Sequence, residues 1–361
     1  MSHPKRLQKL RALLRRHKVD GLLVTSFTNV TYLTGFTGDD SYLLVTLDSE
    51  LLITDPRYTT QLEEECPGLA LKVRQPGERM LPTTAAAIKS AGADRLAIES
   101  DSLTVGTHAK LAEELGDVEI VPKDGLVESL RMIKDRGEVD EIRLAADQAR
   151  RALDVVRAAW TPDATEKDLA RELEYQARRF GGKGLSFPAI VASGPRAALP
   201  HATPTDARVG DEAFTLIDWG VYAHLYASDL TRMVVTQPPT KKFEKVYNTV
   251  LAAQEAAIEA IAPGKQCQEV DAVARGIITK AGYGPKFGHG LGHGLGLEVH
   301  EAPSLGRLQE TELKPGMVVT VEPGIYLPGW GGVRIEDDVL VTKTGYEVLS
   351  DVPKSLESSL L

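Results

Sequence analysis

Cysteine and long apolar runs are both scarce in this sequence. Its 361 residues include only Cys66 and Cys267, too few for a disulfide framework or a thiolate zinc site. No stretch reaches the ~18 consecutive apolar residues of a membrane-spanning helix, and the N-terminus lacks the apolar core of a signal peptide. We therefore expect free thiols and a cytoplasmic protein that does not span a membrane.

An excess of positive charge is missing as well. The 51 Asp and Glu residues outnumber the 42 Lys and Arg residues, whereas nucleic-acid-binding proteins usually carry a basic surface. Hydrophobic residues make up 42% and charged residues 26% of the chain, as in ordinary globular proteins, and this length is typical of two domains. The composition argues against a nucleic-acid or membrane partner.

The first 125 residues or so have the pattern of an α/β domain. An amphipathic helix is predicted over residues 7–17. Short apolar runs between turn residues predict buried strands at residues 21–25, 42–46, 51–54 and 119–121. Pro122 follows the last of these runs and is expected to end it.

A long helix is predicted next, and it opens a larger second domain. Apolar residues recur every three or four positions from Val139 to Trp160, which places them on one helix face. A second helix follows from Asp168 to Gly181. About 100 residues later the pattern returns as a helix over residues 243–261 and another from Asp271. This repetition predicts two α/β halves facing each other, although chance similarity between common helix residues is the alternative.

Two aspartates stand where strand patterns end in the second domain. Asp218 follows the apolar run 213–217, and Asp229 ends a strand-like run over residues 222–229. A hairpin turning near Gly220 would bring both carboxylates together on one face. Because adjacent carboxylates repel, one must take a proton or a cation must lie between them. The alternative is that both are solvated turn residues.

Two glutamates show a similar pattern near the C-terminus. Glu322 follows the buried strand 317–321, and Glu336 ends an alternating segment, 333–336, that is expected to be the neighbouring strand. A buried carboxylate requires a partner. An ion pair of Arg334 with Glu322 or Glu336 is the alternative to a role in ligand binding.

Three histidines lie in a glycine-rich segment that is unsuited to a helix. They are His289, His293 and His300, and the glycines between them allow close approach of the backbone. No glutamate stands where a zincin motif requires it, and there is no Gly-x-Ser-x-Gly elbow. The segment therefore favours a site that does not use a covalent nucleophile.

Together these segments supply four carboxylates and one imidazole, from Asp218, Asp229, His293, Glu322 and Glu336. Four negative charges balance two divalent cations. Oxygen-rich ligation suits Mn(II), with Co(II) or Zn(II) as alternatives. A pair of such ions activates water at neutral pH.

The order of these residues, with intervals of 11, 64, 29 and 14 positions, resembles the pita-bread (creatinase/aminopeptidase P/prolidase) metallopeptidases. The Xaa-Pro aminopeptidase and prolidase branch is the most similar, since Ser193-Gly194-Pro195-Arg196 and Leu199-Pro200-His201 resemble another of its signatures. The resemblance covers essentially the whole chain. It implies an α/β (α+β) fold, with an N-terminal creatinase-like domain, residues 1–127, and a pita-bread catalytic domain with pseudo-twofold related halves, residues 128–361.

The resemblance also implies roles for individual residues. Asp218 binds one metal ion, Asp229 and Glu336 bridge both, and His293 with Glu322 completes the second site. Glu322 is in addition the expected general base and proton shuttle.

Further residues are expected to contact the substrate. By the same resemblance, His300 stabilises the oxyanion and His201 bonds the substrate backbone. His289 lines the proline pocket, supported by Tyr326 and Arg334.

The implied reaction is hydrolysis of the Xaa-Pro bond at the N-terminus of peptides by a homodimeric aminopeptidase. An Xaa-Pro dipeptidase (prolidase) is the first alternative, and it must hold a free proline carboxylate. Arg307 could do this, or it could be a solvated loop charge. A metal-free creatinase-like enzyme or a non-catalytic binding module is less favoured, because both predict loss of the ligands present here.

Overall fold

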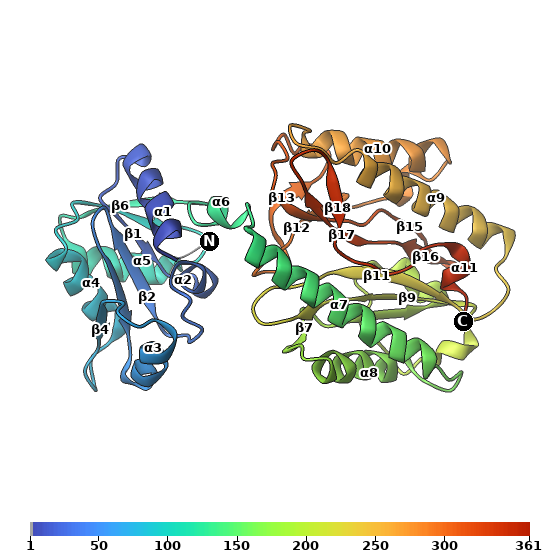
Figure 1. Cartoon of the computed structure of the whole chain (residues 1–361), viewed down its shortest axis with the longest axis horizontal. Helices are drawn as coiled ribbons and strands as arrows, with labels where there is room; N and C mark the ends of the chain where they lie inside the picture. Colours follow the sequence, from blue (N-terminus) through green and yellow to red (C-terminus); the bar gives the residue numbers. More distant parts are fainter. Residues whose placement is uncertain (1–2) are drawn as a thin grey trace. The chain divides into compact units, whose positions relative to one another are not determined.

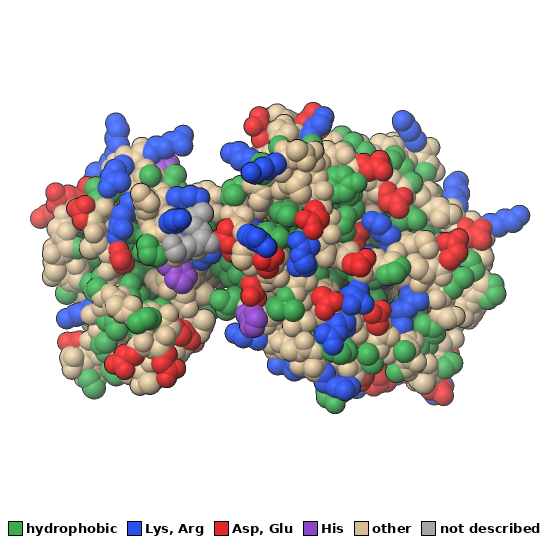
Figure 2. Space-filling model, viewed as in Figure 1, with side chains coloured by type: hydrophobic (Ala, Val, Ile, Leu, Met, Phe, Trp, Pro, Cys, Tyr) green, Lys and Arg blue, Asp and Glu red, His purple; other side chains and the backbone are tan. Residues whose placement is uncertain are grey.

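The computed structural model describes residues 3–361, and the chain divides into two compact units, Met1–Arg131 and Met132–Leu361 (Figure 1). Among the described residues, no helix is long and apolar enough to cross a membrane. Acidic and basic side chains are interspersed on the face of each unit seen in Figure 2.

The first unit contains one six-stranded mixed sheet with the strand order β4-β3-β2-β1-β5-β6. The elements of this unit are α1 (His3–His17), β1 (Gly21–Val24), α2 (Phe27–Thr34), β2 (Tyr42–Thr46), β3 (Glu50–Thr54), α3 (Thr59–Glu65), β4 (Leu71–Val73), α4 (Met80–Ser90), β5 (Arg95–Glu99), α5 (Val105–Leu115), β6 (Glu119–Lys123) and α6 (Glu128–Arg131).

The predicted strands of this unit are present, and their apolar residues form its core. Leu23, Leu44 and Ile53 from three adjacent strands pack with Ile88 of α4 and Leu111 of α5, and all are buried. The strand that was expected to end before Pro122 is β6, and it continues through Pro122 to Lys123. This is possible because β6 is an edge strand, where proline need not donate a ladder hydrogen bond.

The second unit has two helix pairs with sheets between them. Its elements are α7 (Arg136–Ala158), α8 (Glu166–Arg179), β7 (Gly184–Leu185), β8 (Ile190–Ser193), β9 (Phe214–Trp219), β10 (Val221–Tyr222), β11 (Leu230–Val235), α9 (Lys241–Glu259), α10 (Cys267–Lys280), β12 (Gly292–Gly294), β13 (Glu301–Leu305), β14 (Val318–Val321), β15 (Gly324–Leu327), β16 (Gly331–Arg334), β17 (Asp337–Val341), β18 (Tyr346–Val348) and α11 (Leu356–Ser359).

The long helix predicted after the first domain is α7. It begins with a capping box between Asp135 and Glu138, which satisfies free backbone N–H groups at its start. Its predicted apolar face is buried from Val139 to Val156. Trp160 lies beyond the end of the helix, because the backbone leaves the helical conformation at Ala159; its ring still packs at the edge of the same core.

The predicted duplication is present in the backbone. The helix pair α7–α8 is followed by the sheet β11-β9-β8, and the pair α9–α10 by the sheet β13-β12-β14-β17-β18. The second helix of each pair begins with a capping box whose first residue, Thr165 or Gln266, also forms an antiparallel bridge, with Arg208 and Glu312 respectively. The same local hydrogen-bonding pattern therefore occurs in both halves.

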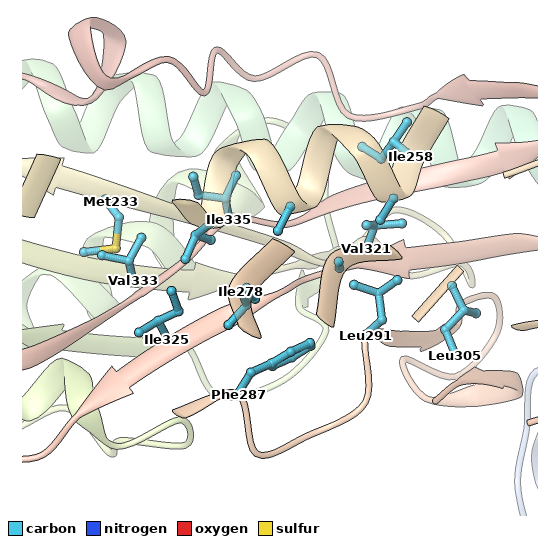
Figure 3. Packing of buried hydrophobic residues seen from close by; sticks show 14 of the residues in the cluster. Met233, Ile258, Ile278, Phe287, Leu291, Leu305, Val321, Ile325, Val333 and Ile335 are labelled. Atoms are coloured by element: carbon cyan, nitrogen blue, oxygen red, sulfur yellow. The ribbon is translucent and has the colours of Figure 1, made fainter. Parts of the chain in front are cut away.

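The two helix pairs cover opposite sides of the strands (Figure 1). Figure 3 shows Ile258 of α9 and Ile278 of α10 beside Val321 of β14 and Ile335, which lies between β16 and β17. These side chains are at most 3% exposed. Burial of this apolar surface fixes the strands from which the polar residues of the site project.

Candidate metal centre

Asp218 and Asp229 lie together at one end of β9 and β11. These strands pair antiparallel, with Trp219 opposite Leu230. A strand over residues 222–229 was wrongly expected: beyond the short β10, residues 223–229 form the connection, and the partner of β9 starts at Leu230. A Cβ on Gly220 would lie 1.8 Å from the carbonyl oxygen of Ser228. Only glycine permits this close approach of the two segments.

Glu322 and Glu336 reach the same place from different elements. Glu322 follows β14 directly, whereas Glu336 lies between β16 and β17 and forms an isolated bridge with Thr231. The expected pairing of segment 333–336 with the strand before Glu322 is wrong. β14 pairs with β17, and Arg334 ends the hairpin of β15 and β16.

His293 lies on β12, in the glycine-rich segment. A Cβ on Gly292 would lie 2.1 Å from the carbonyl oxygen of Thr320, so glycine is required where β12 approaches β14. The Nδ1 of His293 bonds the carbonyl oxygen of Gly294 at 3.1 Å, which places the ring proton on Nδ1. Its Nε2 faces Asp229 Oδ2 at 3.6 Å and Glu322 Oε1 at 3.4 Å.

All five predicted ligands line one cavity of about 540 Å³. Ligand atoms of Asp229, His293 and Glu336 lie within 4.8 Å of one another. Such a cluster of carboxylates and one imidazole is the donor set of a hard or borderline divalent cation.

The electrostatics of these carboxyl groups also fit a cation. Burial, reinforced by neighbouring negative charges, raises the pKa of Asp229 and Glu336 well above the ordinary range, and it raises the pKa of Glu322 to about 8. Oδ1 of Asp218 is buried without a hydrogen-bond partner among residues 3–361. A divalent ion would neutralise these charges and occupy the free oxygen.

Arg334 pairs with neither of the two glutamates that were considered as its alternative partners. Its Nη2 donates to Asp218 at 2.5 Å, not to Glu322 or Glu336. Its Nη1 donates to the Tyr326 hydroxyl at 2.7 Å. The resemblance assigned both residues to the support of the proline pocket. The structure joins Arg334 directly to a predicted metal ligand, and Tyr326 to that ligand through Arg334.

The hydrogen bonds continue to His289. The Tyr326 hydroxyl lies 3.0 Å from Nε2 of His289, whose Nδ1 bonds the carbonyl oxygen of Gly290 at 2.7 Å. Burial and the nearby Arg334 charge lower the pKa of His289 to about 4. A neutral imidazole with its proton on Nδ1 satisfies every one of these contacts.

Thr231 is a member of the site that the sequence analysis missed. Its hydroxyl donates to Glu336 Oε2 at 2.6 Å and accepts from Arg334 Nε at 3.0 Å. It stands two residues after Asp229, and alternate residues of a strand share a face. That spacing is the signal that could have identified it.

The remaining predicted residues are His201, His300 and Arg307. His201 and His300 are exposed side chains that line the cavity, and the ring centres of His300 and His293 are 4.3 Å apart. Arg307 is exposed in the loop after β13 and is not among the described residues that line the cavity. The apolar part of the cavity wall comes from Phe187, Pro188, Ala189, Ile190, Pro200, Ala202 and Pro204.

Comparison with known proteins gives consistent results over the whole chain. The pattern of metallopeptidase family M24 matches residues 140–343, and that of the creatinase/prolidase N-terminal domain matches residues 6–133. The uncharacterized peptidase YqhT of Bacillus subtilis is 41% identical over 97% of this chain and 99% of its own length.

Solved structures are similar over nearly their full lengths. An Xaa-Pro dipeptidase from Bacillus anthracis is 38% identical, with a TM-score of 0.95 and 100% of both chains covered. An X-Pro aminopeptidase from Thermotoga maritima is 35% identical, with a TM-score of 0.87 over 94% of this chain and 97% of that one. The protein is thus an enzyme of metallopeptidase family M24, with the mixed α/β pita-bread fold and an N-terminal domain of the creatinase/prolidase type.

Proposed function

We propose that this enzyme hydrolyses the Xaa-Pro bond at the N-terminus of peptides. The observation that carries the proposal is the five-residue donor set at one cavity wall, joined through Arg334 to Tyr326 and His289. The names of the solved relatives, which include an Xaa-Pro dipeptidase and an X-Pro aminopeptidase, support the same bond specificity.

The donor set would hold two divalent metal ions, with Mn(II) the expected metal and Co(II) or Zn(II) as alternatives. Bound ions would supply Lewis-acid activation of water and of the scissile carbonyl. The holding residues are Asp218, Asp229, His293, Glu322 and Glu336.

Glu322 is the proposed general base. Its carboxylate takes one proton from the attacking water as the oxygen adds to the carbonyl carbon, and then delivers that proton to the proline nitrogen as the C–N bond breaks. His300 donates a hydrogen bond to the oxyanion, and His201 holds the substrate backbone. Both histidines line the cavity with exposed rings, so substrate can reach them.

The proline ring would lie against His289, which Tyr326 and Arg334 support. An Xaa-Pro amide has no N–H, so the usual hydrogen bond for positioning the peptide is missing. A pocket that fits the proline ring would position the substrate in place of this hydrogen bond. Each of the three guanidinium nitrogens of Arg334 already donates a hydrogen bond, to Asp218, Tyr326 or Thr231, so these contacts would hold Arg334 rigidly in place.

An aminopeptidase is preferred to a dipeptidase because a carboxylate clamp is missing from the described cavity wall. Arg334 is the only lysine or arginine among the lining residues of the described chain, and it is already bound to Asp218. A dipeptidase must hold the free carboxylate of proline, for which arginine is the best partner. The dipeptidase remains the second candidate, supported by the 38% identical relative of that name.

The deciding experiment compares Ala-Pro with Ala-Pro-Ala, each incubated with Mn(II)-loaded enzyme. Cleavage of the tripeptide with release of alanine supports the aminopeptidase, and activity confined to the dipeptide supports the second candidate. Ala-Ala-Ala tests the requirement for proline, and the His293→Ala variant controls for contaminating peptidases. Failure to cleave any proline peptide while Mn(II) is bound would defeat the proposed function. The cytoplasmic location and the homodimer remain predictions.

A further inference from the structure

Asp338 is a buried carboxyl group beside the metal centre that the proposed reaction does not use. It is 0% exposed on β17 and is not among the residues that line the cavity. Its Oδ2 accepts the backbone N–H of Asp229 at 3.2 Å, and its Oδ1 has no hydrogen-bond partner among residues 3–361. The contact joins positions 109 residues apart in the sequence.

The neighbouring Asp337 has a very different environment. Arg232 Nη2 donates to it at 2.6 Å, Lys354 Nζ at 2.7 Å and Gln254 Nε2 at 2.8 Å. Asp337 therefore belongs to a well-satisfied structural network, whereas the hydrogen bonds of Asp338 leave one buried oxygen unsatisfied. Burying such a group costs free energy that an apolar residue at this strand position would avoid.

The bond from Asp338 is half of a reciprocal arrangement. The first half of the second unit runs from α7 to β11, and the second half from α9 to β18. Asp338 of the second half accepts the hydrogen bond from the backbone N–H of Asp229, in the first half. In return, Thr231 of the first half donates to Glu336 of the second half, and the Glu336 N–H donates to the Thr231 carbonyl oxygen at 3.2 Å. Each half thus supplies the polar group that orients an acidic residue of the other.

We propose that Asp338 is a positioning residue for the metal centre. By fixing the backbone N–H of Asp229, its Oδ2 sets the direction in which the Asp229 carboxylate projects toward His293 and Glu336. The proposal rests on the proposed function only in so far as Asp229 binds metal. Groups that orient metal ligands in this way typically change metal affinity about 10- to 100-fold when removed.

The test uses three variants of the full-length chain. Asp338→Asn keeps an acceptor oxygen and the same shape, whereas Asp338→Ala and Asp338→Val remove the acceptor. Ser350→Ala is the matched control: Ser350 is also buried, accepts the N–H of Asp338 at 3.2 Å and donates to Asp337 at 2.8 Å. None of its hydrogen bonds reaches Asp229.

Mn(II) dissociation constants are measured by titration calorimetry on metal-free protein, with thermal unfolding to compare stability. We expect at least about tenfold weaker binding in Asp338→Ala and Asp338→Val. Asp338→Asn should bind nearly as wild type does, and Ser350→Ala should lose stability without losing affinity. Should Asp338→Ala fail to fold, the valine variant, which suits a buried strand, gives the same comparison.

Wild-type affinity in the folded acceptor-free variants would overturn the proposal. So would an Asn variant as weak as Ala, or a Ser350→Ala variant that loses as much affinity as Asp338→Ala. Peptidase activity is not read in this experiment. Wild-type protein that binds Mn(II) but cleaves no proline peptide defeats the proposed function and leaves the role of Asp338 intact.

Discussion

Arg334 donates a hydrogen bond of 2.5 Å to Oδ2 of Asp218, and both side chains are buried although 116 residues separate them in the sequence. The guanidinium occupies one oxygen of the carboxylate and leaves Oδ1 without a partner among the described residues. The ion pair therefore holds the Asp218 carboxylate in one orientation, and Oδ1 stays available to bind a cation.

Loss of this pair should damage the site strongly. In Arg334→Met the buried carboxylate of Asp218 loses its partner, so we expect about 3–5 kcal/mol less stability in the metal-free protein. We also expect about 10- to 100-fold lower kcat/KM for an Xaa-Pro-Xaa peptide. Arg307→Met, at an exposed arginine away from the cavity, is the control and should match wild type. Equal behaviour of both variants would contradict the prediction.

Removal of metal should lower both activity and stability. The carboxylates of the donor set repel one another without a cation, so dialysis against a chelator should abolish hydrolysis and Mn(II) should restore it. Ligand at 100 times its dissociation constant adds about 2.7 kcal/mol of stability. Differential scanning calorimetry should show this stabilisation by Mn(II) as a higher Tm for wild type. The control His224→Ala, at an exposed histidine bonded to Glu141, should show the same increase in Tm. The increase should be much smaller for His293→Ala. An undiminished rise in His293→Ala would argue against the proposed ligand set.

The half-buried His289 should make stability depend on pH. Its pKa is lowered by burial from 6.5 to about 4 in the folded protein. Below pH 6.5 the unfolded chain therefore binds a proton that the folded protein does not, and the free energy of unfolding falls as pH decreases toward 4. The contribution is about 1.4 kcal/mol per pH unit at most.

Urea unfolding of metal-free protein between pH 5 and 7 measures this dependence. His289→Gln should show a shallower loss of stability toward acid than wild type. Wild type and His289→Gln differ in this one titrating group, so the difference between their slopes reports His289. A wild-type slope in His289→Gln would contradict the assignment.

A methyl group at Gly292 should disturb the strand that carries His293. In Gly292→Ala the new Cβ would lie 2.1 Å from the carbonyl oxygen of Thr320, and relief of that contact must shift β12. We expect a loss of about 1–3 kcal/mol in stability, as for other overpacked sites, and weaker metal binding. Gly288→Ala in the same segment meets no atom within 4 Å and should behave as wild type in thermal unfolding and metal titration.

Much of the fold, and the residues of the proposed donor set that line the cavity, could be identified from local patterns in the sequence. Several features depend on residues that are close together in the chain. They are the regular spacing of apolar residues in α7, the strands of the first unit, and the repeated helix pairs. The donor residues stood out because Asp218, Asp229 and Glu322 adjoin apolar runs and His293 lies among glycines. A charge at such a position requires a partner, and this requirement can be read from the sequence itself.

Tertiary structure alone decided which of these residues meet. Four contacts of the site join segments that are about 20 to more than 100 positions apart. They are the Arg334–Asp218 ion pair, the pairing of β14 with β17, and the hydrogen bonds of Thr231 and Asp338. Strand pairing sets these contacts, and a shift of one residue would turn every side chain to the opposite face. Amino-acid types therefore determined which chemistry was possible, and the register of distant strands determined where each carboxylate points.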